Sequence, residues 1–384
     1  MFSGQEFQSR LNKVIAGMSD LGLDALVVID DERRIGGGSV RYLTNYYGSI
    51  SLAPAALVLT PPDVTLCLVP GFLGSSFKVA HQQSPWVKEV LGTRAGFWGA
   101  DFAQDIRKAL DKAKPMVRRV GFDGLDLMAE TLAKKIRAAH RDVELFENTG
   151  IVERIRLVKS PSECEVIREA ARLTDIGITA FMDSIKAGNP QYVSTAKAKE
   201  ASKVQGAEEV IVFMGAGNPW IWGEHRGSQV YKDGDMVCFE VSAKFQGYWG
   251  QVARTCIIGN PSGKQRHIYE TVMVAYREMK SMLKPGVRAS ELFGARNRVL
   301  IKAGYDTPGL LHGMRAGHGM GLTIAEGFDI FEGDHTVIQP GFYLEIHDMV
   351  TIPEEGQVAI GGDALLMTET GYEELNQAEY RPQV

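Results

Sequence analysis

One stretch near the middle of the chain constrains the fold most, because it places a carboxylate inside an apolar segment. Residues 236–243 and 248–258 are almost all apolar or β-favouring, and Gly247 between them supplies a tight turn. This pattern predicts a β-hairpin. Side chains alternate along a strand, so Glu240 shares one face with Cys238. Because a buried carboxylate is costly unless something pairs with it, Glu240 is the first candidate functional residue.

Composition restricts the class of protein. A chain of 384 residues with 45% hydrophobic and 23% charged residues can form two ordinary globular domains. The net charge of −5 gives no electrostatic footprint for nucleic acid, and neither a basic block nor a long apolar run indicates a membrane. Without a secretory leader pattern, we expect a cytoplasmic protein. Its cysteines should be free thiols, mostly buried: Cys67, Cys164, Cys238 and Cys256.

The first 150 residues alternate between strand-like and helical patterns. Strands are predicted at residues 25–29, 55–59, 64–69, 118–122 and 143–146. Helices are predicted at residues 5–19, 102–113 and 126–140. This alternation predicts an α/β domain over residues 1–150, with helices packed on a mixed sheet.

A second domain is predicted at residues 151–384. Ser160-Pro-Ser-Glu163 is a capping box with proline at the first helical position, so a helix should begin there. Apolar residues then recur with the spacing of one buried helical stripe. Further helices are predicted at residues 189–205, 264–283 and 288–303.

Three motifs of the second domain together resemble the pita-bread hydrolase superfamily, which includes methionine aminopeptidase, prolidase, aminopeptidase P and creatinase. They are the hairpin with Gly247-Tyr248 and Arg254-Thr255, the loop Gly317-His-Gly-Met-Gly321, and the strand Pro340–His347. The resemblance implies an α/β N-terminal domain followed by an α+β pita-bread catalytic domain. It also implies a homodimer in which one subunit's N-terminal domain closes the partner's site.

The metal ligands of that superfamily are altered in this chain. The superfamily binds a pair of divalent metals with two aspartates, one histidine and two glutamates; the matching positions here are Glu240, Gln251, His318, His347 and Gly361. Two hard cations need several anionic oxygens, and one carboxylate remains, so we expect no dinuclear centre and no required cofactor. Two alternatives stay open. One is a metal-free site with histidine acid/base catalysis, and the other is a single divalent ion held by Glu240, His318 and His347.

Further candidates surround these positions. Glu345 precedes His347 by two residues, so both side chains should share a face. In a metal-free pocket, the carboxylate should orient the ring and raise its pKa. His225 resembles a histidine that is catalytic in creatinase and substrate-binding in the peptidases. Aromatic rings would suit an aromatic or cationic small molecule, and an arginine would suit an anionic group. The predicted substrate-binding residues are Trp220, Trp222, Tyr248, Trp249, Gln251 and Arg315.

This chain carries neither the complete set of peptidase site residues nor the complete set of creatinase site residues. We therefore expect a substrate that is neither a peptide nor creatine. We expect hydrolysis of a C–N bond in a small molecule, as in an amidinohydrolase or amidase. His225, His318 and His347 would transfer protons, and Glu240 or Glu345 would orient them. The alternatives are a lyase that acts by proton abstraction, an Xaa-Pro peptidase-like hydrolase, and a binding protein without catalysis.

Overall fold

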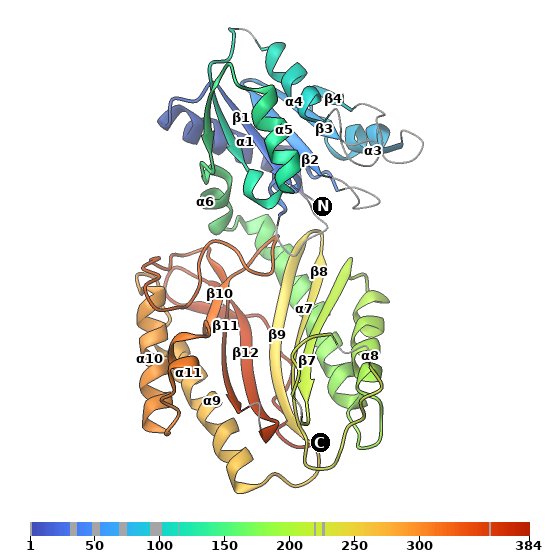
Figure 1. Ribbon diagram of the computed structural model, residues 1–384, viewed down its shortest axis with the longest axis vertical. Coiled ribbons are helices and arrows are strands. Elements are labelled where there is room, and N and C mark those ends of the chain that lie inside the picture. The colour runs from blue at the N-terminus through green and yellow to red at the C-terminus, as the bar shows by residue number, and fades with distance from the viewer. Residues whose placement is uncertain are drawn as a thin grey trace. The chain divides into compact units, whose positions relative to one another are not determined.

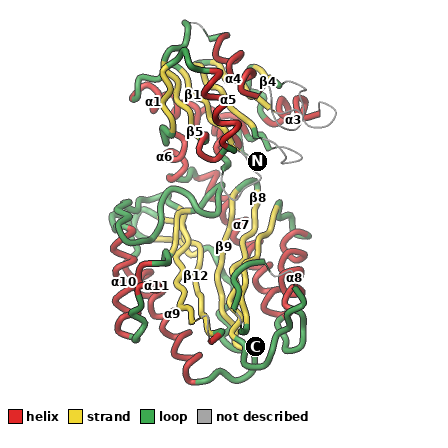
Figure 2. The backbone as a smooth tube through the Cα atoms, viewed as in Figure 1, coloured by secondary structure: helices red, strands yellow, loops and turns green. Residues whose placement is uncertain are grey.

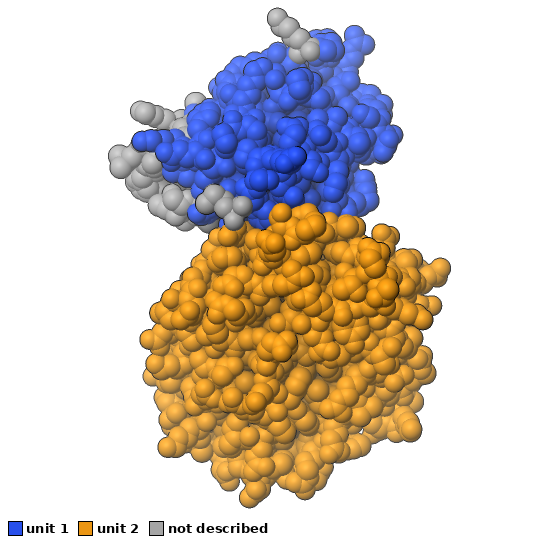
Figure 3. Space-filling view, turned by 180° about the vertical axis from the view of Figure 1, so that it is seen from behind, with its two compact units in different colours: residues 1–156 blue, residues 157–384 orange. Residues whose placement is uncertain are grey.

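The computed structural model divides into two compact units, residues 1–156 and 157–384 (Figure 3). It describes residues 2–30, 37–47, 54–68, 75–92, 102–113, 115–218, 220–224, 227–352 and 355–384. Each unit has its own sheet and its own buried core (Figures 1 and 2). Among the described helices, none combines the length and the apolar character that crossing a membrane requires.

The first unit contains a mixed sheet, as predicted. Among its described residues the strand order is β4-β3-β2-β1-β5-β6, with β1 antiparallel to β2 and parallel to β5. Helical connections make β1, β5 and β6 parallel neighbours, whereas the tight turn after Thr60 makes β2 and β3 an antiparallel hairpin. The strands are β1 Ala25–Asp30, β2 Ala55–Thr60, β3 Asp63–Leu68, β4 Glu89–Leu91, β5 Arg119–Asp123 and β6 Glu144–Glu147.

The helices of the first unit follow the predicted pattern with additions. The predicted helix at residues 126–140 is in fact a 3-10 turn, Leu125–Leu127, followed by α5. Helices α2 and α3 and strand β4 were not predicted, and Val69, the end of a predicted strand, lies outside the described residues. The helices are α1 Gly4–Asp20, α2 Ser39–Thr44, α3 Ser75–Gln83, α4 Phe102–Asp111, α5 Glu130–Ala139 and α6 Ile151–Leu157.

Acid should weaken the first unit through His140. This side chain is buried against Phe122, and burial lowers its pKa from 6.5. As the pH falls from 6.5 towards the lowered value, the unfolded chain takes up a proton that the folded chain refuses, so the free energy of unfolding falls. We expect His140→Leu to flatten this part of the stability-against-pH curve, measured by urea unfolding between about pH 5 and 7. If the slope of stability against pH is the same in the variant, His140 is not the group responsible.

The second unit is built on an antiparallel sheet with the order β10-β11-β12-β9-β8-β7, and β13 pairs with β12. The predicted hairpin is confirmed as β8 and β9. Gln246 and Gly247 both have positive φ, 45° and 91°, which is the geometry of a two-residue turn between twisted strands. The strands are β7 Glu209–Ala216, β8 Met236–Phe245, β9 Tyr248–Ile257, β10 Gly317–Gly319, β11 Tyr343–Ile352, β12 Gln357–Met367 and β13 Tyr372–Glu374.

Helices cover one face of this sheet. A Cβ at Gly250 would meet the Ala170 carbonyl of α7 at 2.6 Å, and one at Gly361 would meet Met273 Sδ of α9 at 2.8 Å, so both helices pack on that face (Figure 1). The Ser160–Glu163 capping box is confirmed at the start of α7. The helices are α7 Pro161–Ser184, α8 Gln191–Lys203, α9 Gly263–Met282, α10 Ala289–Lys302 and α11 Pro308–His312. The opposite face carries the polar residues described below.

The cysteines are free, as predicted. Cys238 lies opposite Thr255 and Cys256 lies opposite Val237, so the two hairpin thiols point to opposite faces of the sheet.

Candidate active site

The helix-free face of the second sheet gathers the candidate residues in one row. Directly opposed residues in an antiparallel sheet point to the same side. The register pairs His347 with Gly362, Gly362 with Ala253, and Ala253 with Glu240, and so carries the row across β11, β12, β9 and β8. The two small residues leave room between the histidine and the glutamate. Gln251, two residues before Ala253, shares this face.

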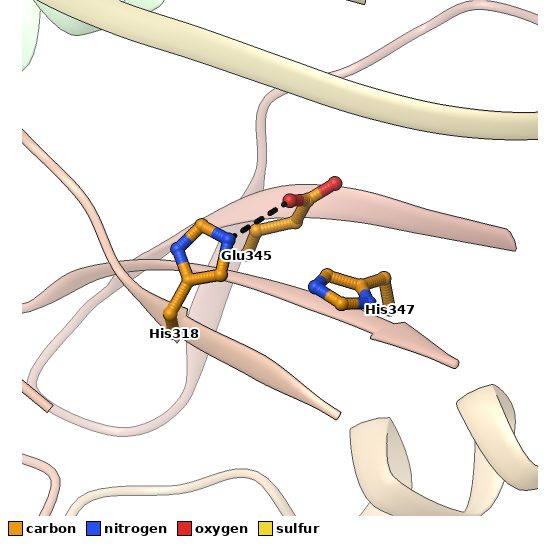
Figure 4. A group of neighbouring side chains, drawn as sticks. All are labelled: His318, Glu345 and His347. Atoms are coloured by element: carbon orange, nitrogen blue, oxygen red, sulfur yellow. Dashed lines mark ion pairs between the residues drawn. The ribbon is translucent and has the colours of Figure 1, made fainter. Parts of the chain in front are cut away.

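Three of the predicted residues converge at one end of this face (Figure 4). His318 lies opposite Glu345 in the β10–β11 register, and its Nε2 atom is 3.6 Å from Glu345 Oε2. The rings of His318 and His347 have centroids 5.6 Å apart. One ligand atom from each of the three residues lies within 4.8 Å of the others, which is a spacing that could hold a metal ion. All three are buried.

Burial governs the charge of this cluster. It lowers the pKa of His318 well below 6.5 and that of His347 to about 3, and it raises the pKa of Glu345 well above 4.5. Burial thus opposes the charged forms of both partners in the 3.6 Å contact between His318 and Glu345. Neutral imidazoles keep a lone pair free for a cation. Our expectation that Glu345 raises the His347 pKa is wrong, because burial lowers it and the charges of Arg315 and Arg296 lower it further.

Several polar atoms of these side chains have no partner within the described residues. The His318 Nδ1 atom is 3.1 Å from the Gly319 carbonyl, and donation there leaves the Nε2 lone pair facing Glu345. Among the described residues, neither Glu345 oxygen has a hydrogen-bond partner, and neither does His347 Nδ1. Buried polar atoms are normally satisfied, so this cluster has the character of a binding site.

Glu240 and Gln251 form a second polar group on the same face. Burial raises the pKa of Glu240 to about 7, while the Arg315 charge and a hydrogen bond with Gln251 lower it. Glu240 is in turn the charge that raises the pKa of Glu345 most, after burial. The two carboxyl groups therefore act on one another electrostatically. A carboxyl group with a pKa near 7 is suited to accept and return protons at neutral pH.

The structure changes two details of the ligand positions counted along the sequence. Glu345, rather than Glu240, joins the two histidines in the three-residue cluster. Gly361, which the count placed at the last ligand position, points to Met273 on the helix-covered face, and Gly362 is the residue beside His347. Whichever of the two glycines matches the last glutamate ligand of the superfamily, that position carries no carboxylate in this chain.

Gly362 should be sensitive to substitution. A Cβ at this position would lie 2.4 Å from His347 Cβ and 2.5 Å from the Ile346 carbonyl, so Gly362→Ala must displace β11. We expect a loss of about 1–3 kcal/mol in the free energy of unfolding, the usual range for overpacking, together with reduced activity. Gly361→Ala is the matched control, because the atom nearest to its Cβ would be the sulfur of the flexible Met273 side chain, at 2.8 Å. Urea unfolding measures the free energy of unfolding of both variants. Equal losses would contradict the close packing of Gly362 against β11.

Three of the predicted aromatic residues lie on the site face of the sheet. Trp220 and Trp222 stack with centroids 5.7 Å apart and pack against Cys238, Ala253 and Met349 on the site face, next to the polar cluster. Trp249 shares the face of Gln251, and the Lys244 ammonium lies over its ring.

Tyr248 and Arg254 lie on the other face of the sheet. The Tyr248 hydroxyl is 2.6 Å from Glu163 of α7, so its predicted role in substrate binding is corrected to a structural one. Arg254 donates to Asp363 at 2.8 Å and to the Gly362 carbonyl, and so ties β9 to β12 as a structural ion pair.

Arg315 and His225 complete the predicted set. Arg315 pairs with Asp329 at 2.8 Å, and its charge acts on Glu240 and on both histidines. His225 lies outside the described residues. Sequence reasoning did not single out Gly362 or Met349. Met349 follows from the alternation along β11 that placed His347, whereas Gly362 lies beside His347 only through the β11–β12 register.

Comparison with known proteins supports this reading of the fold. Residues 10–158 match the Creatinase/Prolidase N-terminal domain, and residues 165–369 match metallopeptidase family M24. The prolidase of Pyrococcus horikoshii has the same fold, with a TM-score of 0.82 and 23% identity over 97% of this chain and 99% of that one. The two-domain architecture implied by the three motifs is confirmed.

Three relatives are named for two kinds of activity. The Xaa-Pro dipeptidase of Pyrococcus furiosus is 30% identical over 60% of this chain and 66% of its own length. The corresponding match to the Xaa-Pro dipeptidase of Pyrococcus horikoshii covers 65% of that relative, so this chain matches just under two thirds of either protein. The creatinase of a Bacillus species is 25% identical over 74% of this chain and 73% of that protein.

Proposed function

Because this chain belongs to metallopeptidase family M24, we propose that it is an amide hydrolase of the Xaa-Pro dipeptidase kind that works with one divalent ion. The observation that carries the proposal is the cluster of His318, Glu345 and His347 on the face that also holds Glu240. Within the described parts of the chain, both Glu345 oxygens and His347 Nδ1 have no hydrogen-bond partner. Relatives named as Xaa-Pro dipeptidases favour a peptide-type amide over the amidine of a creatinase-like substrate.

The donor atoms do not fit two ions. A dinuclear centre needs bridging carboxylates to offset the repulsion of its cations, and Gln251 and Gly362 stand where such oxygens would be required. They do fit one ion. Two imidazoles and one carboxylate are a recurrent donor set for zinc, iron or manganese, and two neutral histidines have their lone pairs available.

Each group in the site then has a role. When bound, the ion supplies Lewis-acid polarisation of a carbonyl group. His318 is held in one tautomer by its bond to the Gly319 carbonyl, and Glu345 would supply the anionic oxygen that holds the ion. Glu240 takes up and returns the proton of the attacking water, and Gln251 orients its carboxyl group. Trp220 and Trp222 exclude water from the apolar side of the site.

The proposal predicts hydrolysis of a dipeptide such as Ala-Pro, with products whose masses sum to the substrate plus one water. Chelator should remove the activity, and about one equivalent of a divalent transition ion per chain should restore it. Mass spectrometry of the products separates the outcomes. Products that sum to the substrate alone would establish a lyase, and activity that survives complete metal removal would establish a metal-free site.

Assembly forms part of the proposal as well. We propose that this chain forms a homodimer and acts on a small molecule, as its resemblance to creatinase implies. Sedimentation velocity tests it, and a fully active monomer would contradict it.

A further inference from the structure

We infer that the buried ion pair between Lys159 and Glu326 holds the loop that follows His318, and so sets where this histidine lies in the cluster. Both are positioning residues, because neither contributes a ligand atom to the cluster of His318, Glu345 and His347. That the cluster holds a metal ion rests on the proposed function. The basis of the inference is the set of contacts by which Lys159 and Glu326 reach the loop.

Lys159 is fixed at its backbone and extends its ammonium group to the loop. It directly precedes Ser160, the N-cap of α7, and its amide donates to the Gly341 carbonyl at 2.8 Å, just before β11 begins. Its Nζ atom donates to Glu326 Oε1 at 2.8 Å, and the two side chains are 1% and 10% exposed. The pair therefore links the start of α7 and the start of β11 to the loop that follows His318.

The loop is folded around Glu326. The Glu326 amide donates to the Gly319 carbonyl at 2.9 Å, and the Gly319 amide donates to the Phe328 carbonyl at 2.9 Å. A Cβ at Gly319 would overlap the Glu326 carbonyl oxygen, and a Cβ at Gly321 would overlap Glu326 Oε1. Both glycines after His318 thus leave room for Glu326, so a shift of Glu326 must move the backbone next to the histidine.

Stability alone is a weak reason to bury these two charges. Desolvation of a buried pair offsets much of its attraction, so apolar residues of similar volume often stabilise a protein as well. A charge-assisted hydrogen bond does fix a distance and a direction. The His318 Nε2 atom is 3.6 Å from Glu345 Oε2, and a set of ligands must be held to within about 0.5 Å of its working geometry. The ion pair between Lys159 and Glu326 is suited to supply that precision.

Co²⁺ binding to the metal-free protein tests the inference with the variants Lys159→Met, Glu326→Gln and the two combined. Each single variant should lower the affinity for Co²⁺ about 10- to 100-fold, the range for residues that orient metal ligands. The double variant should lower it to the same extent, because either change already removes the same interaction. Since the double variant removes both charges, it should fold even where a single one does not. Folded variants that bind Co²⁺ as tightly as the wild type, with only a lower midpoint of urea unfolding, would overturn the inference.

Arg10→Met is the matched control. It also removes the cation of a largely buried ion pair, which Arg10 forms with Glu6 at 3.0 Å in the first unit. The comparison therefore separates an effect on the loop from a general loss of stability. The affinity for Co²⁺ should be unchanged in this variant, and a loss equal to that of Lys159→Met would contradict a specific role for the pair.

Hydrogen exchange of the metal-free proteins, measured by mass spectrometry over residues 316–328, gives a readout that needs no metal. Exchange in this segment should be faster in the variants of Lys159 and Glu326 than in the wild type, and unchanged in Arg10→Met. Equal exchange rates in all of them would refute the inference, even if the wild type binds no Co²⁺. Absence of Co²⁺ binding by the wild type counts against the proposed function instead, so the two failures are distinguishable.

Discussion

The His347→Gln protein should lose nearly all activity, with kcat/KM lowered by roughly 10²- to 10⁴-fold, the range for a group that takes part directly in the chemistry. His347 contributes one of the three ligand atoms of the cluster and lies opposite Gly362 on the helix-free face of the sheet. Glutamine has similar length but lacks the imidazole lone pair, so the ion should be lost together with the turnover. Steady-state kinetics and metal analysis of the purified variant measure both effects.

His335→Gln is the matched control for this variant. His335 is exposed, its Nδ1 atom lies 3.3 Å from the Ser290 hydroxyl, and it is outside the cluster. It should retain its metal and its activity. If His347→Gln keeps wild-type turnover and only lowers the melting temperature, His347 is structural and the assignment of β11 to the site fails.

Arg296→Met should cause the largest loss of stability. The Arg296 Nε atom donates to Asp348 Oδ1 at 2.7 Å, and both side chains are at most 1% exposed. Removing the cation leaves the Asp348 charge buried without its partner, a change that costs about 3–5 kcal/mol in other proteins. Because Asp348 follows His347 on the opposite face of β11, the strand that positions the histidine should loosen as well. Urea unfolding measures the loss.

The double variant Arg296→Met with Asp348→Leu is the control for this pair. It removes both charges and leaves an apolar contact of similar volume, so much of the lost stability should return. A double variant as unstable as the single one would show that packing of the Arg296 stem, rather than the orphaned charge, dominates.

Local patterns were sufficient for much of the fold. The β8–β9 hairpin follows from two apolar runs around a glycine turn, and the start of α7 follows from its capping box. Strand β7 was missed, although Val210-Ile-Val-Phe213 favours a strand, because its place depends on pairing with β8. The two-domain architecture came from the spacing of three motifs and is confirmed by the matched families.

The site was predictable in its members but not in its grouping. Strand alternation placed Glu345 and His347 on one face, and the glycine loop identified His318. That Glu345 rather than Glu240 joins the histidines depends on the register between β10 and β11, which is a long-range property. The direction of the His347 pKa shift was predicted wrongly for the same reason, since burial is set by distant segments.

Titration of the metal-free protein with Co²⁺, followed by visible absorption, tests the central claim most directly. One ion held by His318, Glu345 and His347 should give d–d bands that saturate at about one equivalent per chain, and Glu345→Gln should abolish them while the protein stays folded by circular dichroism. Saturation at about two equivalents, no saturable binding by the folded protein, or full binding by Glu345→Gln would contradict the account.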